Sequence, residues 1–251
     1  MLKFLTLVGR EIRSYFCSAT AYIVLCFFLL LTGFNFYIDI SLLSRHATEI
    51  TVVEVFFNSI AFWIGFLLIF PPITMRSFSE EFKLGTIEML MTAPVRDWQV
   101  VLAKFCGAVF FYIVLWLPSF LYFVFFERIT QAQAAHASGA YISTYLLLLL
   151  VGMFFISIGC FTSVLTQNQI VAAVMSFCVI TIFFFGGLMG YFMPNISPML
   201  REIVGYFSTL EHMGEFTKGI IDSRRLVFYG TATFFMLVLT HQFLQYRRWK
   251  V

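Results

Sequence analysis

Long runs without a charged side chain dominate this sequence. They cover residues 14–38, 55–75, 105–126, 129–200 and 226–246. A helix that crosses a bilayer needs about 20 apolar residues, so each run is long enough to span one. The run 129–200 is long enough for two helices, and the polar segment 166–169 divides it. The apolar residues are continuous and do not alternate, which favours helices over barrel strands.

The pattern predicts an all-α integral membrane protein with six transmembrane helices. Its composition agrees, because 61% of the 251 residues are hydrophobic and only 12% are charged, whereas a soluble domain is about 25% charged. We expect residues 1–251 to form one transmembrane domain in membrane lipid, and the net charge of +3 gives no indication of nucleic acid. The expected spans are 20–38, 55–75, 100–126, 141–165, 170–193 and 226–246.

The distribution of lysine and arginine predicts the orientation. With the N-terminus inside, the inner segments hold ten of these residues and the outer segments hold six. Loops on the cytoplasmic side carry the excess of positive charge. We therefore expect both termini, and the segment 76–97, to lie in the cytoplasm.

The N-terminal segment 2–16 is amphipathic when it is drawn as a helix. This pattern predicts an interfacial helix that lies on the inner leaflet before the first span. A basic orientation signal with chance periodicity is the alternative interpretation. The apolar face holds Leu5, Val8, Ile12, Tyr15 and Phe16, and the polar face holds Lys3, Thr6, Arg10 and Arg13.

The segment 76–97 gathers charged residues between two apolar runs. Gly85 suits a left-handed helix end, and Thr86 can cap a second short helix over 87–92. Pro94 ends that helix, because the residue before a proline avoids helical geometry. Asp97 can then cap the third span. An ordinary solvated loop is the alternative interpretation.

The same segment resembles the permeases of the ABC-2 type exporter family, most closely the gliding-motility and copper-processing permease subunits. A second motif, from His212 to Arg224, resembles the stretch that precedes the last span in that family. The first motif is carried by Arg76, Glu80, Glu81, Gly85, Thr86, Glu88, Leu90, Thr92, Ala93, Pro94 and Lys104.

The resemblance implies that the segment 76–97 is a coupling helix that docks on an ATPase subunit. It further implies a second permease copy or a related permease, and a bacterial cytoplasmic (inner) membrane. The sequence has no G-x-x-x-x-G-K-[ST] phosphate-binding loop, so ATP and Mg are expected on the partner ATPase and no cofactor on this chain. The expected coupling residues are Arg76, Glu80, Glu81, Gly85, Thr86, Glu88 and Pro94.

Residues near the predicted outer surface form a second candidate group. Gly186 and Gly190 have GxxxG spacing, which permits close helix approach. Short outer helices are expected over 195–225, with Ser208 as one cap and Asp222 as the cap of the last span. An outer gate and simple packing remain open as roles for this group. It comprises Gly186, Gly187, Gly190, His212, Gly219 and Asp222.

The sequence contains no His-Glu-x-x-His motif and no recognisable nucleophile triad. We therefore expect neither an enzyme nor a metal site. Ser157, Thr162 and Ser163 are expected to bond to helix carbonyls or to neighbouring helices. No charge is expected inside a span, which argues against an ion-coupled transporter. The function expected is the permease subunit of an ABC exporter, and the alternative is mechanotransmission or a scaffold role in gliding motility or envelope assembly.

Overall fold

A computed structural model describes residues 2–44, 51–87, 96–129, 138–192 and 197–249 of the chain. The described residues form helices and contain no strand, so the predicted all-α fold is confirmed. Six helical stretches are long and apolar enough to cross a membrane, as predicted. They are Ala19–Leu43, Ile60–Leu84, Asp97–Phe126, Gly139–Leu165, Gln169–Met189 and Ser223–Arg247.

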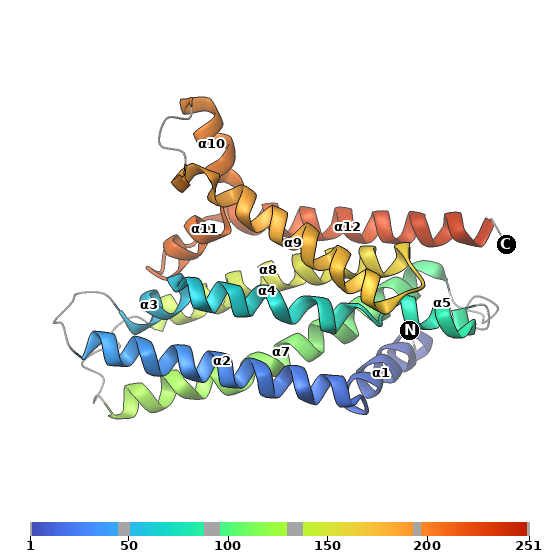
Figure 1. Ribbon diagram of the computed structural model, residues 1–251, viewed down its shortest axis with the longest axis horizontal. Coiled ribbons are helices and arrows are strands. Elements are labelled where there is room, and N and C mark those ends of the chain that lie inside the picture. Colours follow the sequence, from blue (N-terminus) through green and yellow to red (C-terminus); the bar gives the residue numbers. More distant parts are fainter. Residues whose placement is uncertain (1, 45–50, 88–95, 130–137, 193–196, 250–251) are drawn as a thin grey trace.

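The long helices α2 (Ala19–Leu43), α4 (Ile60–Thr74), α7 (Asp97–Ile129), α8 (Ser138–Leu165), α9 (Gln169–Phe192) and α12 (Ser223–Trp249) form one elongated bundle (Figure 1). One end of the bundle carries α1 (Leu2–Phe16), α5 (Ser79–Leu84) and both ends of the chain (Figure 1). The other end carries α3 (Val52–Asn58), α10 (Pro198–Phe207) and α11 (Thr209–Phe216). The termini and α5 therefore share one end of the bundle.

Aromatic side chains fill the centre of the bundle. Trp116 of α7 is buried against Phe57 of α3 and Phe62 of α4, and Trp63 of α4 is buried against Phe184 of α9. Two of the buried polar groups have partners inside the bundle: the Trp63 indole N–H donates to Phe57 O at 2.9 Å, and the Tyr112 hydroxyl donates to Leu148 O at 2.8 Å. Without water in the membrane, such internal partners are required.

The second predicted span differs from the structure at its start. The expected helix 55–75 is divided between α3 and α4 at Ser59, where the backbone is extended. Ser59 Oγ donates to Asn35 Oδ1 at 3.0 Å, and the Asn35 amide donates to Phe56 O at 3.5 Å. These two hydrogen bonds stabilise the break between α3 and α4. The prediction of a single helix rested on the charge-free run 55–75, which gives no indication of a break. The Thr51 side chain accepts from Glu54 N and starts α3.

The prediction that no span carries a buried charge is wrong. Helix α2 continues past Asp39 and α7 begins before Lys104, and both side chains are only 3% exposed. Charged residues were used as the limits of the apolar runs, but the helices extend beyond those limits. Lys104 is compensated by two carboxylates, as described below.

Candidate functional site

The short helix α5 lies at the end of the bundle that also carries the chain termini (Figure 1). It follows α4 after a turn at residues 75–78. Pro71 and Pro72 lie in the last turn of α4 and withhold two N–H donors, which favours an early end to that helix. Gly85 ends α5 with φ of 68°, so the predicted left-handed conformation is confirmed.

Ser163 of α8 holds the start of α5. Its hydroxyl oxygen accepts from the backbone N–H of Phe78 at 3.0 Å and of Ser79 at 3.1 Å. The same hydroxyl donates to Met75 O at 3.2 Å. The first amides of a helix lack partners within it, so one buried side chain of another helix satisfies two of them. The prediction that Ser163 bonds to a neighbouring helix is confirmed.

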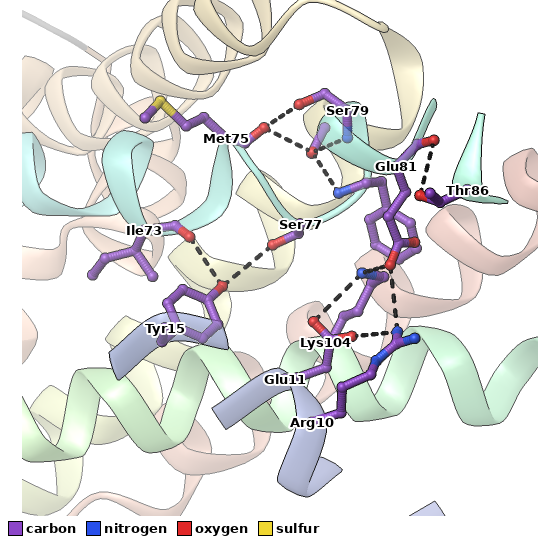
Figure 2. Close-up of polar contacts among 12 residues, drawn as sticks. Arg10, Glu11, Tyr15, Ile73, Met75, Ser77, Ser79, Glu81, Thr86 and Lys104 are labelled. Carbon is purple, nitrogen blue, oxygen red and sulfur yellow. Dashed lines mark hydrogen bonds and ion pairs between the residues drawn. The ribbon is translucent and has the colours of Figure 1, made fainter. Parts of the chain in front are cut away.

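A network of four charged side chains joins α5 to α1 and α7 (Figure 2). Lys104 Nζ lies 2.8 Å from Glu81 Oε1 and 3.5 Å from Glu11 Oε2. Arg10 lies 2.7 Å from Glu11 and 3.4 Å from Glu81. The Lys104 side chain is 4% exposed and the carboxylates are mostly covered, so these pairs are screened less by salt than surface pairs.

Close helix packing makes this network feasible. A Cβ at Gly107 of α7 would lie 2.9 Å from the Glu11 side chain, so only glycine allows α1 to approach so closely. Tyr15 and Phe16 of α1 pack on Phe111 of α7. The Tyr15 hydroxyl donates to Ile73 O at 3.0 Å, and burial raises the pKa of this hydroxyl above its ordinary value. Helix α1 is thereby fixed to α4 and α7.

Arg247 of α12 forms the remaining support. Its guanidinium lies 4.6 Å from the centre of the Phe82 ring of α5, and its Nη2 donates to Leu165 O at 2.6 Å. Lys104 Nζ lies 5.3 Å from the centre of the Phe78 ring. Such cation–π contacts stabilise partly desolvated pairs by about 1 kcal/mol. Helix α5 is thus attached to α7, α8 and α12.

The far surface of α5 is uncovered. Lys83, Gly85 and Thr86 are exposed, and Leu84 is 66% exposed. We call these four residues the α5 tip.

The predicted coupling residues fall into two groups. Arg76 and Glu81 face inward, to Ser18 and Lys104 respectively, and Glu80 lines a cavity beside them. Gly85 and Thr86 belong to the α5 tip, where the Thr86 hydroxyl donates to Glu81 O at 3.5 Å. Glu88 and Pro94 lie outside the described residues, as does most of the predicted helix 87–92.

The outer candidates lie at the opposite end of the bundle. A Cβ at Gly187 would meet the backbone of Phe207 and Ser208 at 2.8 Å, which favours the packing role there. Gly186 has open space beside it, and Gly190 lies in the last turns of α9. Gly219 has φ of 81°. Asp222 Oδ1 accepts from Arg224 N at 2.9 Å at the start of α12, as predicted.

His212 is completely buried between α11 and α12. Its Nδ1 lies 2.9 Å from the Tyr229 hydroxyl. Burial lowers the pKa of His212 to about 4, and Arg225 contributes in the same direction. Among the described residues, no group of three or more His, Cys, Asp or Glu side chains lies close enough together to hold a metal ion.

Several contributors could not be recognised from the sequence. Ser163 and Arg247 are far from α5 along the chain, Arg10 is predicted only as part of the polar face of an amphipathic helix, and Glu11 carries no prediction. The one available signal was Lys104, which belongs to the motif that begins at Arg76. Its pairing with Glu81 depends on the fold.

One protein-family model matches most of the helices described above. The family model described as "ABC-2 family transporter protein" matches residues 35–210, more than two thirds of the chain. The chain belongs to the ABC-2 transporter family. The match extends from α2 to the start of α11 and includes α5. No curated protein matches the chain.

Membership of the ABC-2 family agrees with the fold. The chain is a multi-pass membrane protein and a permease of this class. ABC-2 permeases are the membrane components of transport systems that associate with ABC ATPases, and they are generally not catalytic themselves.

Proposed function

We propose that this ABC-2 permease is the membrane subunit of an exporter and that a separate ATPase binds it at the α5 tip. The observation that supports this most directly is the two-sided environment of α5. Buried contacts from Ser163, Lys104 and Arg247 hold one side, while Leu84 is exposed on the other. A force applied at the tip would reach three spans without passing through a flexible segment.

The proposed sequence of events starts with ATP binding to two ATPase subunits beneath a pair of permeases. Their closure moves α5, and the ion network carries the movement to α1 and α7. Ser163 and Arg247 carry it to α8 and α12. The pathway then opens on the α10–α11 side. ATP and Mg²⁺ belong to the ATPase, because this sequence has no phosphate-binding loop.

This proposal assigns the N-terminus, the C-terminus and α5 to the cytoplasm. The excess of lysine and arginine supports that orientation. The two termini and α5 lie at the same end of the bundle (Figure 1), so in this proposal all three lie on the same side of the membrane. The alternative, mechanotransmission without cargo, uses the same docking and differs only in what the spans move.

Co-purification with an ATPase tests the proposal. The full chain is tagged in its native host, and the eluate is assayed for ATP hydrolysis and for a protein with a phosphate-binding loop. Leu84→Asp should remove both, because it places a charge at the centre of the apolar contact. Ile220→Asp is the matched control, since Ile220 is 59% exposed at the opposite end. Retention of the ATPase by the Leu84 variant would contradict docking at the tip.

A further inference from the structure

A cavity of about 550 Å³ lies between α1, the start of α2, the end of α4 and α5. This volume falls within the range of roughly 300–1,000 Å³ that is usual for small-molecule sites. Its walls combine two kinds of surface. Ser18, Arg76 and Glu80 supply polar groups, and Val24 and Leu84 supply aliphatic ones. Such a mixture suits an amphiphilic ligand.

The charges that line the cavity balance formally. Three are cationic and three are anionic, and four of the six pair with one another in the network around Lys104. The remaining two are Arg76 and Glu80, for which no ion pair is found within the described part of the chain. The cavity therefore offers one guanidinium and one carboxylate, and it favours a ligand with one negative and one positive group.

The Arg76 guanidinium is positioned to bind an anionic oxygen atom of a ligand. Its Nη1 donates to Ser18 Oγ at 2.8 Å, while its Nε is buried and has no hydrogen-bond partner. A buried donor without an acceptor costs free energy, and a phosphate oxygen would remove that cost. Ser18 Oγ lies 2.7 Å from the Thr20 hydroxyl, so two hydroxyl groups adjoin the guanidinium.

The position of the cavity indicates where the ligand comes from. Ser18 precedes the first turn of α2, and Arg76 follows the last turn of α4, so both mark the polar limit of apolar spans. Lipid headgroups lie at this level of a bilayer. The Ser18 hydroxyl does not cap α2, which leaves the positive end of that helix directed to the same region.

We propose that this cavity binds the headgroup of a zwitterionic phospholipid of the phosphoethanolamine type. The phosphate lies against Arg76, Ser18 and Thr20, and the ammonium group lies toward Glu80. Val24 contacts the glycerol and the first acyl carbons. The lipid belongs to the leaflet on the α1 side and fills the space between the interfacial helix and α5.

Native mass spectrometry of the purified full chain in detergent tests this inference. Phosphatidylethanolamine and phosphatidylglycerol are added separately, and the retained lipid is counted over a concentration series. Arg76→Gln and Glu80→Gln should each weaken retention of phosphatidylethanolamine about ten-fold, since a charge-assisted bond is lost. Arg224→Gln and Glu202→Gln are the matched controls, because both side chains are exposed at the opposite end.

Thr20→Val provides a milder variant that keeps the volume and should weaken retention less. Equal retention of phosphatidylglycerol, or no difference between the cavity variants and their controls, would overturn the proposal. Competition by soluble glycerophosphoethanolamine at the same concentration would assign the site to a free phosphate ligand and overturn the lipid assignment. No ATPase is present, so loss of docking at Leu84 would leave this result unchanged.

Discussion

Lys104 Nζ lies 2.8 Å from Glu81 Oε1, and this ion pair joins the exposed helix α5 to the buried side of α7. The two residues belong to different helices, and Glu11 and Arg10 extend the contact to α1. A movement of α5 therefore cannot leave α1 and α7 unaffected.

Replacement of Lys104 by methionine should destabilise the protein. The substitution leaves Glu11 and Glu81 in a largely buried place without their shared cation, at a cost on the order of 3 kcal/mol. The thermal unfolding midpoint in detergent should fall, and amide exchange in 78–84 should accelerate. Lys83→Met is the control, since Lys83 is exposed on the α5 tip. Equal effects of the two variants would contradict the structural importance of the pair.

Ser163→Ala should loosen α5 specifically. The variant leaves the amides of Phe78 and Ser79 without an acceptor, at a cost of about 1–3 kcal/mol. Hydrogen–deuterium exchange should increase in 78–84 while α7 changes little. Ser157→Ala is a matched control, because its hydroxyl donates only to Phe154 O of its own helix. Unchanged exchange in the Ser163 variant would show that the hydroxyl does not hold α5.

Gly187→Ala and Gly186→Ala should differ although the residues are adjacent. A Cβ at Gly187 meets the backbone of Ser208, so overpacking should cost about 1–3 kcal/mol. A Cβ at Gly186 meets nothing within 4 Å, and alanine there should be neutral or slightly stabilising. The thermal unfolding midpoints of the two variants, each compared with that of the unsubstituted protein, test this difference. A loss at Gly186 alone would favour an interface with a second chain over packing against Ser208.

His212 should make the outer helices sensitive to acid. Its pKa is about 4 in the folded protein and ordinarily 6.5, so the unfolded chain binds more protons between these values. Stability should therefore fall as the pH drops from about 6.5 to about 4, by at most about 3 kcal/mol.

The pKa of Glu211 is raised by burial, so this carboxyl opposes the effect of His212. A carboxyl whose pKa is raised in the folded state makes the folded protein less stable as the pH rises. The His212→Gln variant separates the two, because it removes only the histidine contribution. Unfolding midpoints measured from pH 7.5 to pH 4.5 should show a shallower slope for the variant. An unchanged slope would contradict the assignment.

Hydrophobic runs predicted the number of spans because lipid imposes the same requirement on every spanning helix. They could not predict the break at Ser59, since polar residues there bond to Asn35 of another helix. A signal was nonetheless present: Thr51 and Glu54 have capping-box spacing, and they start α3. The glycine at position 85 likewise predicted a left-handed helix end, which the structure has.

The supports of α5 were beyond prediction from one sequence. Ser163 and Arg247 approach α5 only because α8 and α12 end at the same side of the bundle (Figure 1). A closely packed glycine of α8 escaped prediction for the same reason: a Cβ at Gly159 would clash with the Thr74 side chain of α4. Sequence spacing drew attention to Gly186 and Gly190 instead.

Photo-crosslinking from position 84 is the most direct measurement of where energy enters this permease. A photoreactive amino acid is placed at Leu84 on the α5 tip and, as control, at Met199 of α10, which is 73% exposed at the opposite end. Crosslinked partners are identified by mass spectrometry in native membranes. We expect an ATPase with a phosphate-binding loop from position 84 and not from position 199. An ATPase captured only from position 199, or from neither, would contradict the proposed docking.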